Sequence, residues 1–90
     1  MNFQLRKQID EWIMDNYPDS EILIADGLEE AFVGVATQFN TSMAIFDTEK
    51  CLDILEKEGM SREEAIEYFE FNIIGAYVGE HTPAFLNKFS

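Results

Sequence analysis

The chain has 90 residues, 18 of them acidic and 6 basic, which gives a formal net charge of −12 at pH 7. Its length predicts a single domain over residues 1–90, and its eight Phe, three Tyr and one Trp argue against disorder. The acid excess disfavours direct binding to nucleic acid or to an anionic membrane, because phosphate contacts need clustered Lys and Arg.

Cysteine usage and the length of the apolar runs predict a cytoplasmic protein. Cys51 is the only cysteine in the sequence, so no intrachain disulfide can form, and this favours a reducing compartment. The first residues lack the apolar stretch of a signal peptide. No apolar run approaches the roughly 20 residues that span a bilayer.

The first predicted element is a helix over residues 3–16. Ile9 and Trp12 lie on one helical face of this segment, while acidic residues occupy the other face. Pro18 ends the helix, because proline pushes the preceding Tyr17 out of the α region.

The middle of the chain predicts β-structure. Residues 22–25 form a short apolar run that precedes an Asp-Gly turn dipeptide, and residues 32–39 are rich in β-branched and aromatic side chains. A turn cluster at residues 40–42 precedes a third expected strand at 43–46. The simplest arrangement is a three-stranded antiparallel meander. The alternative within 27–31 is a single helical turn.

The last third predicts two helices. Asp47 or Thr48 can cap a first helix that Gly59 closes, and a capping box opens a second helix over residues 62–78. The fold class is therefore α+β: an N-terminal helix, a three-stranded antiparallel β-meander and two C-terminal helices packed on the sheet. Residues 71–78 are apolar nearly all round, which predicts a passage through the core or a homodimer interface.

Asn72 and Gly75 are unexpected in this apolar helix. The spacing places the Asn72 amide on an apolar face, where an unbonded amide would cost roughly 1–3 kcal/mol. Asn72 therefore either bonds to nearby backbone or lines a pocket. For Gly75 the alternatives are close packing against the sheet and a ligand that approaches the backbone.

The sequence gives little support for a metal site or for a nucleophilic cysteine. Asp26, Glu29, Glu30 and Asp47 have oxygen ligands that suit Mg²⁺ or Ca²⁺, but they match no calcium loop, and acids are expected at turns and helix starts. We therefore predict no metal and no cofactor. Cys51 is expected to face the core, and the single histidine, at position 81, is expected to be solvated.

Three stretches together resemble a group of small phage and bacterial proteins of unknown function. The first is residues 25–35, with an ADG-x-E-x-AF-x-G pattern; the others are 46–51 and 64–85, the last with EYFEFN-x-x-GAYVG-x-x-TP-x-F. The resemblance covers about residues 22–85 and implies a phage or prophage setting, hence a host cytoplasm, but no reaction. Its polar positions form a candidate site or a shared hydrogen-bond network, namely Asp26, Glu29, Asp47, Asn72 and Thr82, followed by Pro83.

The leading hypothesis is a small acidic accessory protein that acts by binding a protein partner, with a basic partner favoured. A sharper form is a DNA mimic that inhibits a host DNA-binding or defence enzyme. Between Lys7 and Lys50 the chain has ten acids and no base, and the candidate acidic face comprises Asp10, Glu11, Asp15, Asp19 and Glu21.

Two alternatives stay open. One is a small-ligand- or metal-binding protein, or an enzyme, built around Asp26, Glu29, Asp47 and Asn72. The other is a structural homodimer that associates through residues 71–78. No catalytic constellation is recognisable, so the sequence favours a protein that is not an enzyme.

Overall fold

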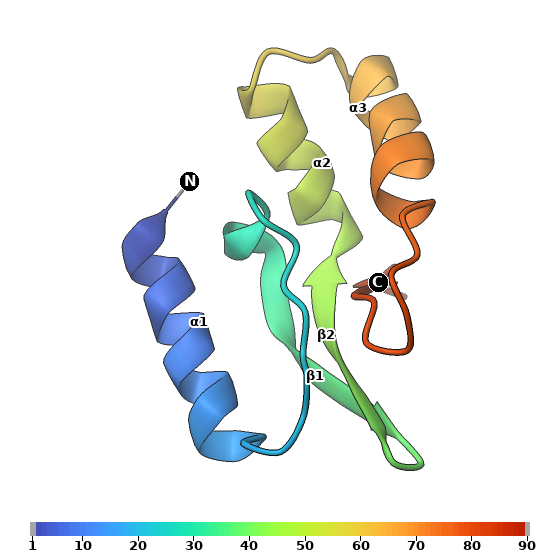
Figure 1. Cartoon of the computed structure of the whole chain (residues 1–90). Helices are drawn as coiled ribbons and strands as arrows, with labels where there is room; N and C mark the ends of the chain where they lie inside the picture. Colours follow the sequence, from blue (N-terminus) through green and yellow to red (C-terminus); the bar gives the residue numbers. More distant parts are fainter. Residues whose placement is uncertain (1, 90) are drawn as a thin grey trace.

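The computed structural model describes residues 2–89 (Figure 1). It confirms an α+β protein with an N-terminal helix, a three-stranded sheet and two later helices. In chain order the elements are α1 (Phe3–Asn16), η1 (Glu29–Ala31), β1 (Phe32–Gln38), β2 (Thr41–Asp47), α2 (Thr48–Lys57), α3 (Arg62–Tyr68), η2 (Phe69–Ile74) and β3 (Ala84–Leu86).

The sheet is mixed, so the predicted antiparallel meander is wrong in one strand. The strand order is β1-β2-β3, with β1 antiparallel and β3 parallel to β2. Residues 22–25 are not a strand; they run alongside the core, where Ile22 and Ile24 pack while Leu23 is exposed. The alternation of these side chains is that of a strand, but the place beside β2 is taken by Ala84–Leu86 from the other end of the chain.

A two-residue turn, Phe39–Asn40, joins β1 to β2, because Gln38 pairs with Thr41. The turn overlaps the predicted cluster at residues 40–42 only at Asn40. Phe39 has a positive φ of 57° and is almost fully exposed at the hairpin tip. Figure 1 shows this hairpin extending away from the helices.

Local capping chemistry fixes the ends of α2 and the start of α3, as the sequence predicts. The Lys50 amide donates to Asp47 Oδ1 at 3.3 Å at the start of α2. At its end Gly59 has φ 109°, and the Met60 amide donates to the Leu55 carbonyl, which closes the helix with a left-handed cap. The Ser61 capping box is present at α3.

The predicted helix over 62–78 ends earlier and changes its winding. After Tyr68 the chain forms the π-helical turn η2, which stops at Gly75. Within η2 only Phe69 is buried, while Phe71 is 76% exposed, so the expected passage of this segment through the core is wrong. The wider winding of a π-helix breaks the α-helical register that the sequence periodicity assumes.

Gly75 is required by the helix itself rather than by packing on the sheet. A Cβ at this position would lie 2.9 Å from the carbonyl oxygen of Phe71. We therefore expect Gly75→Ala to lower the free energy of unfolding by about 1–3 kcal/mol, as overpacking does elsewhere. Urea denaturation checks the value. Ala76→Ser, at the next and also exposed residue, is the matched control and should change it by less than about 0.5 kcal/mol.

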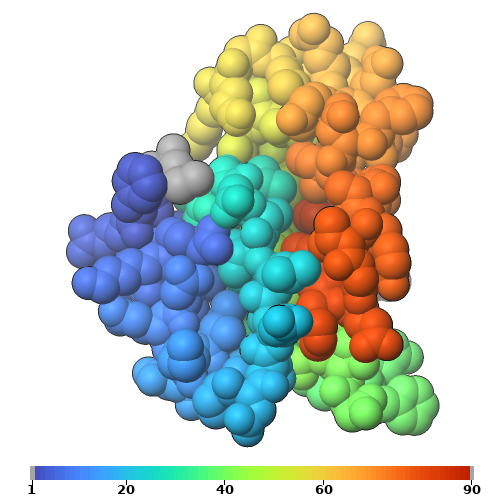
Figure 2. Space-filling view, in the orientation of Figure 1, coloured from blue at the N-terminus to red at the C-terminus, as the bar shows by residue number. Residues whose placement is uncertain are grey.

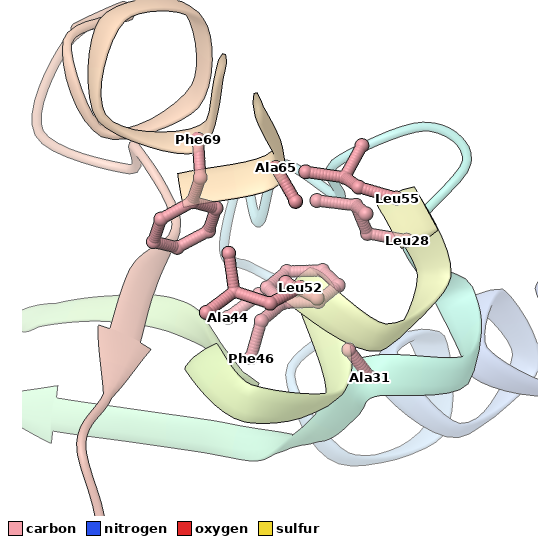
Figure 3. Packing of buried hydrophobic residues seen from close by; sticks show 9 residues of the cluster. Leu28, Ala31, Ala44, Phe46, Leu52, Leu55, Ala65 and Phe69 are labelled. Carbon is pink, nitrogen blue, oxygen red and sulfur yellow. The ribbon is translucent and has the colours of Figure 1, made fainter. Parts of the chain in front are cut away.

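The core lies between the sheet, α2 and the α3–η2 segment (Figure 3). Phe46 is fully buried at its centre, with the Phe32 and Phe85 rings at centroid distances of 5.7 and 6.0 Å. α1 (Figure 2) stands at one side of the molecule, and Ile9 is its one buried residue. None of the helices in residues 2–89 has the length and apolar character that a membrane span needs.

Candidate functional site

Asp26 and Glu29 come together at Arg6, a residue that the sequence analysis did not single out. Arg6 Nη1 donates to Asp26 Oδ1 at 2.5 Å and lies 3.6 Å from Glu29 Oε2, while its Nε donates to Asp10 at 3.1 Å. The Glu29 side chain is only 2% exposed, and its carboxylate also accepts from the Gly27 amide at 3.1 Å. This Arg6 cluster joins α1 to the turn before η1.

Arg6 carries the positive charge of this cluster. The hydrogen bond to Asp26 raises the pKa of Arg6, against a smaller opposing effect of burial. The guanidinium therefore remains charged, and it supplies the positive charge beside the buried carboxylate of Glu29. The sequence pointed to Arg6 only indirectly. Arg6 and the next residue, Lys7, are the last basic residues before Lys50, so few cations are present to pair with the acids between them.

Asp47 lies elsewhere, at the junction of β2 and α2. Its side chain is 3% exposed and pairs with Lys88 at 2.8 Å in addition to capping α2. The hydrogen bond from Lys88 is the main reason that the pKa of Asp47 is lowered, and the backbone amide of Lys50 adds to it. This carboxylate is thus satisfied by local and terminal contacts of the fold.

A pH-dependent contribution to stability follows from Asp47. Because its pKa is lowered in the folded state, the stabilisation is complete above the usual value of 3.8 and is lost as the pH falls through the lowered value. We expect Asp47→Asn to be less stable than the parent protein at neutral pH, with a gap that stays constant down to about pH 5 and narrows below about pH 4. Urea denaturation across this range measures the gap. A gap that widens toward acid would contradict the assignment.

Asp26, Asn72 and Thr82 line one cavity of about 600 Å³. It lies between the extended segment 23–28 and the C-terminal part of the chain, with Leu28, Leu55, Ile73 and Phe85 among its apolar walls. Figure 2 shows these two segments side by side on the face in view. The structure therefore gathers three of the five predicted polar residues at one cavity. Glu29 shares the Arg6 cluster with Asp26, and Asp47 lies apart, paired with Lys88.

The polar side chains at this cavity differ in their hydrogen bonds and exposure. Thr82 Oγ1 donates to the Gly79 carbonyl at 2.6 Å and accepts from the Val78 amide at 2.9 Å, so its hydroxyl shapes the local loop. Asn72 is exposed, and the predicted buried amide is therefore wrong. The reason is again η2, which turns Asn72 outward. Within residues 2–89 no three His, Cys, Asp or Glu side chains are grouped so that they could hold a metal ion.

The five acids of the predicted interaction face are all exposed; they are Asp10, Glu11, Asp15, Asp19 and Glu21. Asp10 is the one of these five with an ion pair in the described part of the chain. They lie along α1 and the loop that follows it. The helix also has Arg6 and Lys7 near its start, so the acidic surface begins after its first turn.

Cys51 and His81 both contact other parts of the fold rather than solvent alone. Cys51 is fully buried, as expected, and burial raises the pKa of its thiol to about 12. His81 is partly buried rather than solvated: its Nδ1 lies 2.9 Å from the carbonyl oxygen of Ser42. This contact ties the loop before β3 to β2.

Four large apolar side chains within residues 71–78 are exposed. Phe71, Ile74, Tyr77 and Val78 are 76%, 53%, 75% and 65% exposed. We call these four residues the η2 surface, although Tyr77 and Val78 follow η2 in the chain. Of the two outcomes that the sequence left open for residues 71–78, the exposure excludes the passage through the core and leaves the homodimer interface untested.

Comparisons with protein-family models, with curated proteins and with solved structures find no match to this chain. The resemblance to the group of phage and bacterial proteins therefore remains an expectation.

Proposed function

We propose that the chain is a small acidic accessory protein that binds a protein partner through the η2 surface. The observation that carries this proposal is the exposure of four large apolar side chains within eight consecutive residues. Single exposed apolar residues are normal on a protein surface, whereas contiguous ones mark interaction sites. π-Helical turns are also frequent at functional sites.

The charge of the flanking sequence favours a basic partner. From Glu63 to Asn87 the sequence has five acids and no Lys or Arg. A complementary partner segment presents apolar side chains flanked by Lys or Arg, because opposite charges around an interface speed association and exclude acidic competitors. The resemblance supplies the setting that we propose: a phage or prophage protein in the host cytoplasm.

The test compares the parent protein with Phe71→Ser/Tyr77→Ser, which removes two exposed rings without touching the core. Phe3→Ser on α1, where the ring is 77% exposed, is the matched control. Partners captured from lysate of the producing cell are identified, purified and titrated against all three proteins. We expect the double variant to bind at least about 10-fold more weakly and the control to bind like the parent. Equal binding by all three proteins would contradict the proposal.

A second candidate function is DNA mimicry by the acidic face of α1. It is favoured by the exposure of Glu11, Asp15, Asp19 and Glu21, none of which has an ion pair within residues 2–89. A carboxylate array that replaces DNA phosphates must compete with DNA and weaken steeply with salt. Neutralising Asp10, Glu11 and Asp15 together should abolish inhibition of a DNA-binding target. Unchanged inhibition would exclude this mode.

A further inference from the structure

The β1–β2 hairpin differs in charge from the rest of the chain. Residues 31–46 contain no charged side chain, in a protein with 18 acids and 6 bases. Two copies of a protein with net charge −12 repel each other over most of their surfaces. Along the hairpin they can approach without bringing carboxylates together.

β1 is an edge strand, and its outer edge has no partner. Gln38 and Thr41 flank the two-residue turn, so the alternation of an antiparallel ladder points the backbone groups of Val35 and Thr37 away from β2. Within residues 2–89 no backbone group from another segment hydrogen-bonds to this edge. Proteins usually protect such edges with charges, proline or bulges. Here the irregularity near Val33 leaves the regular stretch beyond it unprotected.

We propose that β1 pairs antiparallel with β1 of a second copy, across a two-fold axis next to Ala36. The resulting sheet has six strands in the order β3-β2-β1-β1-β2-β3. In this register Val35 pairs with Thr37 of the second copy, and both residues have free backbone groups. The self-complementary edge is what a two-fold interface requires.

Two exposed apolar side chains, one at the irregularity of β1 and one in the turn that follows β1, fit the same register. Val33 is 54% and Phe39 is 96% exposed, and they lie at equal sequence distances on either side of Ala36. Antiparallel pairing about Ala36 therefore brings the hairpin turn with Phe39 in one copy close to the irregularity at Val33 in the other. The pairing also gives a role to a phenylalanine that sits at a strained positive φ.

The dimer is expected to be weak. One strand pair and two apolar contacts bury less than the ~1,200 Å² of a standard stable interface, so we expect a dissociation constant of about micromolar or above. This inference concerns a surface different from the η2 surface, and it stands or falls independently of the proposed function.

Charge substitution at Ala36 tests the pairing. Ala36 is exposed and pairs with Met43, so its side chain lies on the face opposite Phe46 and tolerates a longer residue. We expect the parent protein to show a concentration-dependent dimer in sedimentation equilibrium. Ala36→Glu and Ala36→Lys should each remain monomeric, because two like charges meet at the axis. An equimolar mixture of the two variants should restore the dimer.

Gln38→Glu is the matched control, since it adds the same charge on the same strand but faces Gly34 of the second copy. It should weaken the dimer far less than Ala36→Glu does. A parent protein that stays monomeric up to millimolar concentration would overturn the proposal. So would a dimer that Ala36→Glu leaves intact and Phe71→Ser/Tyr77→Ser dissociates, because its contact would then be the η2 surface.

Disulfide trapping checks the register. Directly opposed residues at a non-hydrogen-bonded antiparallel position have Cα atoms about 4.5 Å apart, within the range that a disulfide spans. We expect Ala36→Cys to form an intermolecular disulfide on mild oxidation and Gln38→Cys to remain largely reduced. Cys51 does not interfere because it is fully buried. Efficient cross-linking of Gln38→Cys with none at Ala36→Cys would overturn this register.

Discussion

Phe46→Ala is expected to lower the free energy of unfolding by about 3–5 kcal/mol, the usual cost of removing a buried aromatic ring. Phe46 is fully buried and contacts both Phe32 and Phe85, which belong to β1 and β3. Its ring thus joins the two outer strands of the sheet through its central strand. The cavity left by alanine would lie where helix and strand residues meet (Figure 3), so no single segment can move to fill it.

The measurement is urea denaturation at neutral pH, followed by circular dichroism. A domain of this size has a total stability of roughly 5–13 kcal/mol, so Phe46→Ala should be marginally folded or unfolded at room temperature. Phe3→Ala removes the same ring from a site where it is 77% exposed, and it should change the stability by less than about 0.5 kcal/mol. Comparable losses for the two variants would contradict the placement of the core.

Local chemistry made much of this fold predictable. Helix α1 has the predicted bounds, and both Asp47 and Ser61 cap the helices that the sequence assigned to them. These features depend on side chains within a few residues of each other, so the sequence contains the whole interaction. The sheet depends on distant segments, and there the prediction was wrong in one strand.

Long-range pairing explains that error. Residues 22–25 have the better strand pattern, whereas β3 comprises only Ala84–Leu86. β3 gains its place through its pairing with Ile45, Phe46 and Asp47 and through the Phe85 ring, which packs against Phe69 at 5.1 Å. None of these contacts is visible in the local pattern of such a short segment.

For the candidate site too, the sequence pointed to some of the residues but not to their distant partners. The resemblance marked Asp26, Glu29 and Asp47 as members of a candidate site or hydrogen-bond network, and the structure places the last two among buried residues. The sequence did not indicate their partners, because Arg6 and Lys88 lie more than twenty residues from Glu29 and Asp47. The exposure of Asn72 and of the η2 surface depends on a change of helix winding that periodicity does not reveal.

Arg6→Ala is the second substitution for which we expect a large effect, about 3 kcal/mol of lost stability. Arg6 is the cation that the structure places beside the buried carboxylate of Glu29, and it also binds Asp10 and Asp26. Removing it would leave the buried carboxyl group of Glu29 without its cation. Arg6→Lys should recover part of the loss, since one ammonium group cannot reproduce the separate contacts of Nε and Nη1.

A double-mutant cycle identifies which carboxylate is responsible. Glu29→Gln removes the charge but keeps an oxygen that can accept from the Gly27 amide. If the buried charge explains the effect, Arg6→Ala should cost about 1 kcal/mol or less in the Glu29→Gln background, because the exposed pairs with Asp10 and Asp26 contribute little. An unchanged cost would instead assign the loss to those surface pairs or to the packing of α1. If the cost falls in the Glu29→Gln background, the contact between Arg6 and Glu29 is what fixes α1 against the turn before η1. That turn also places Asp26 at the cavity, and α1 carries the acidic face.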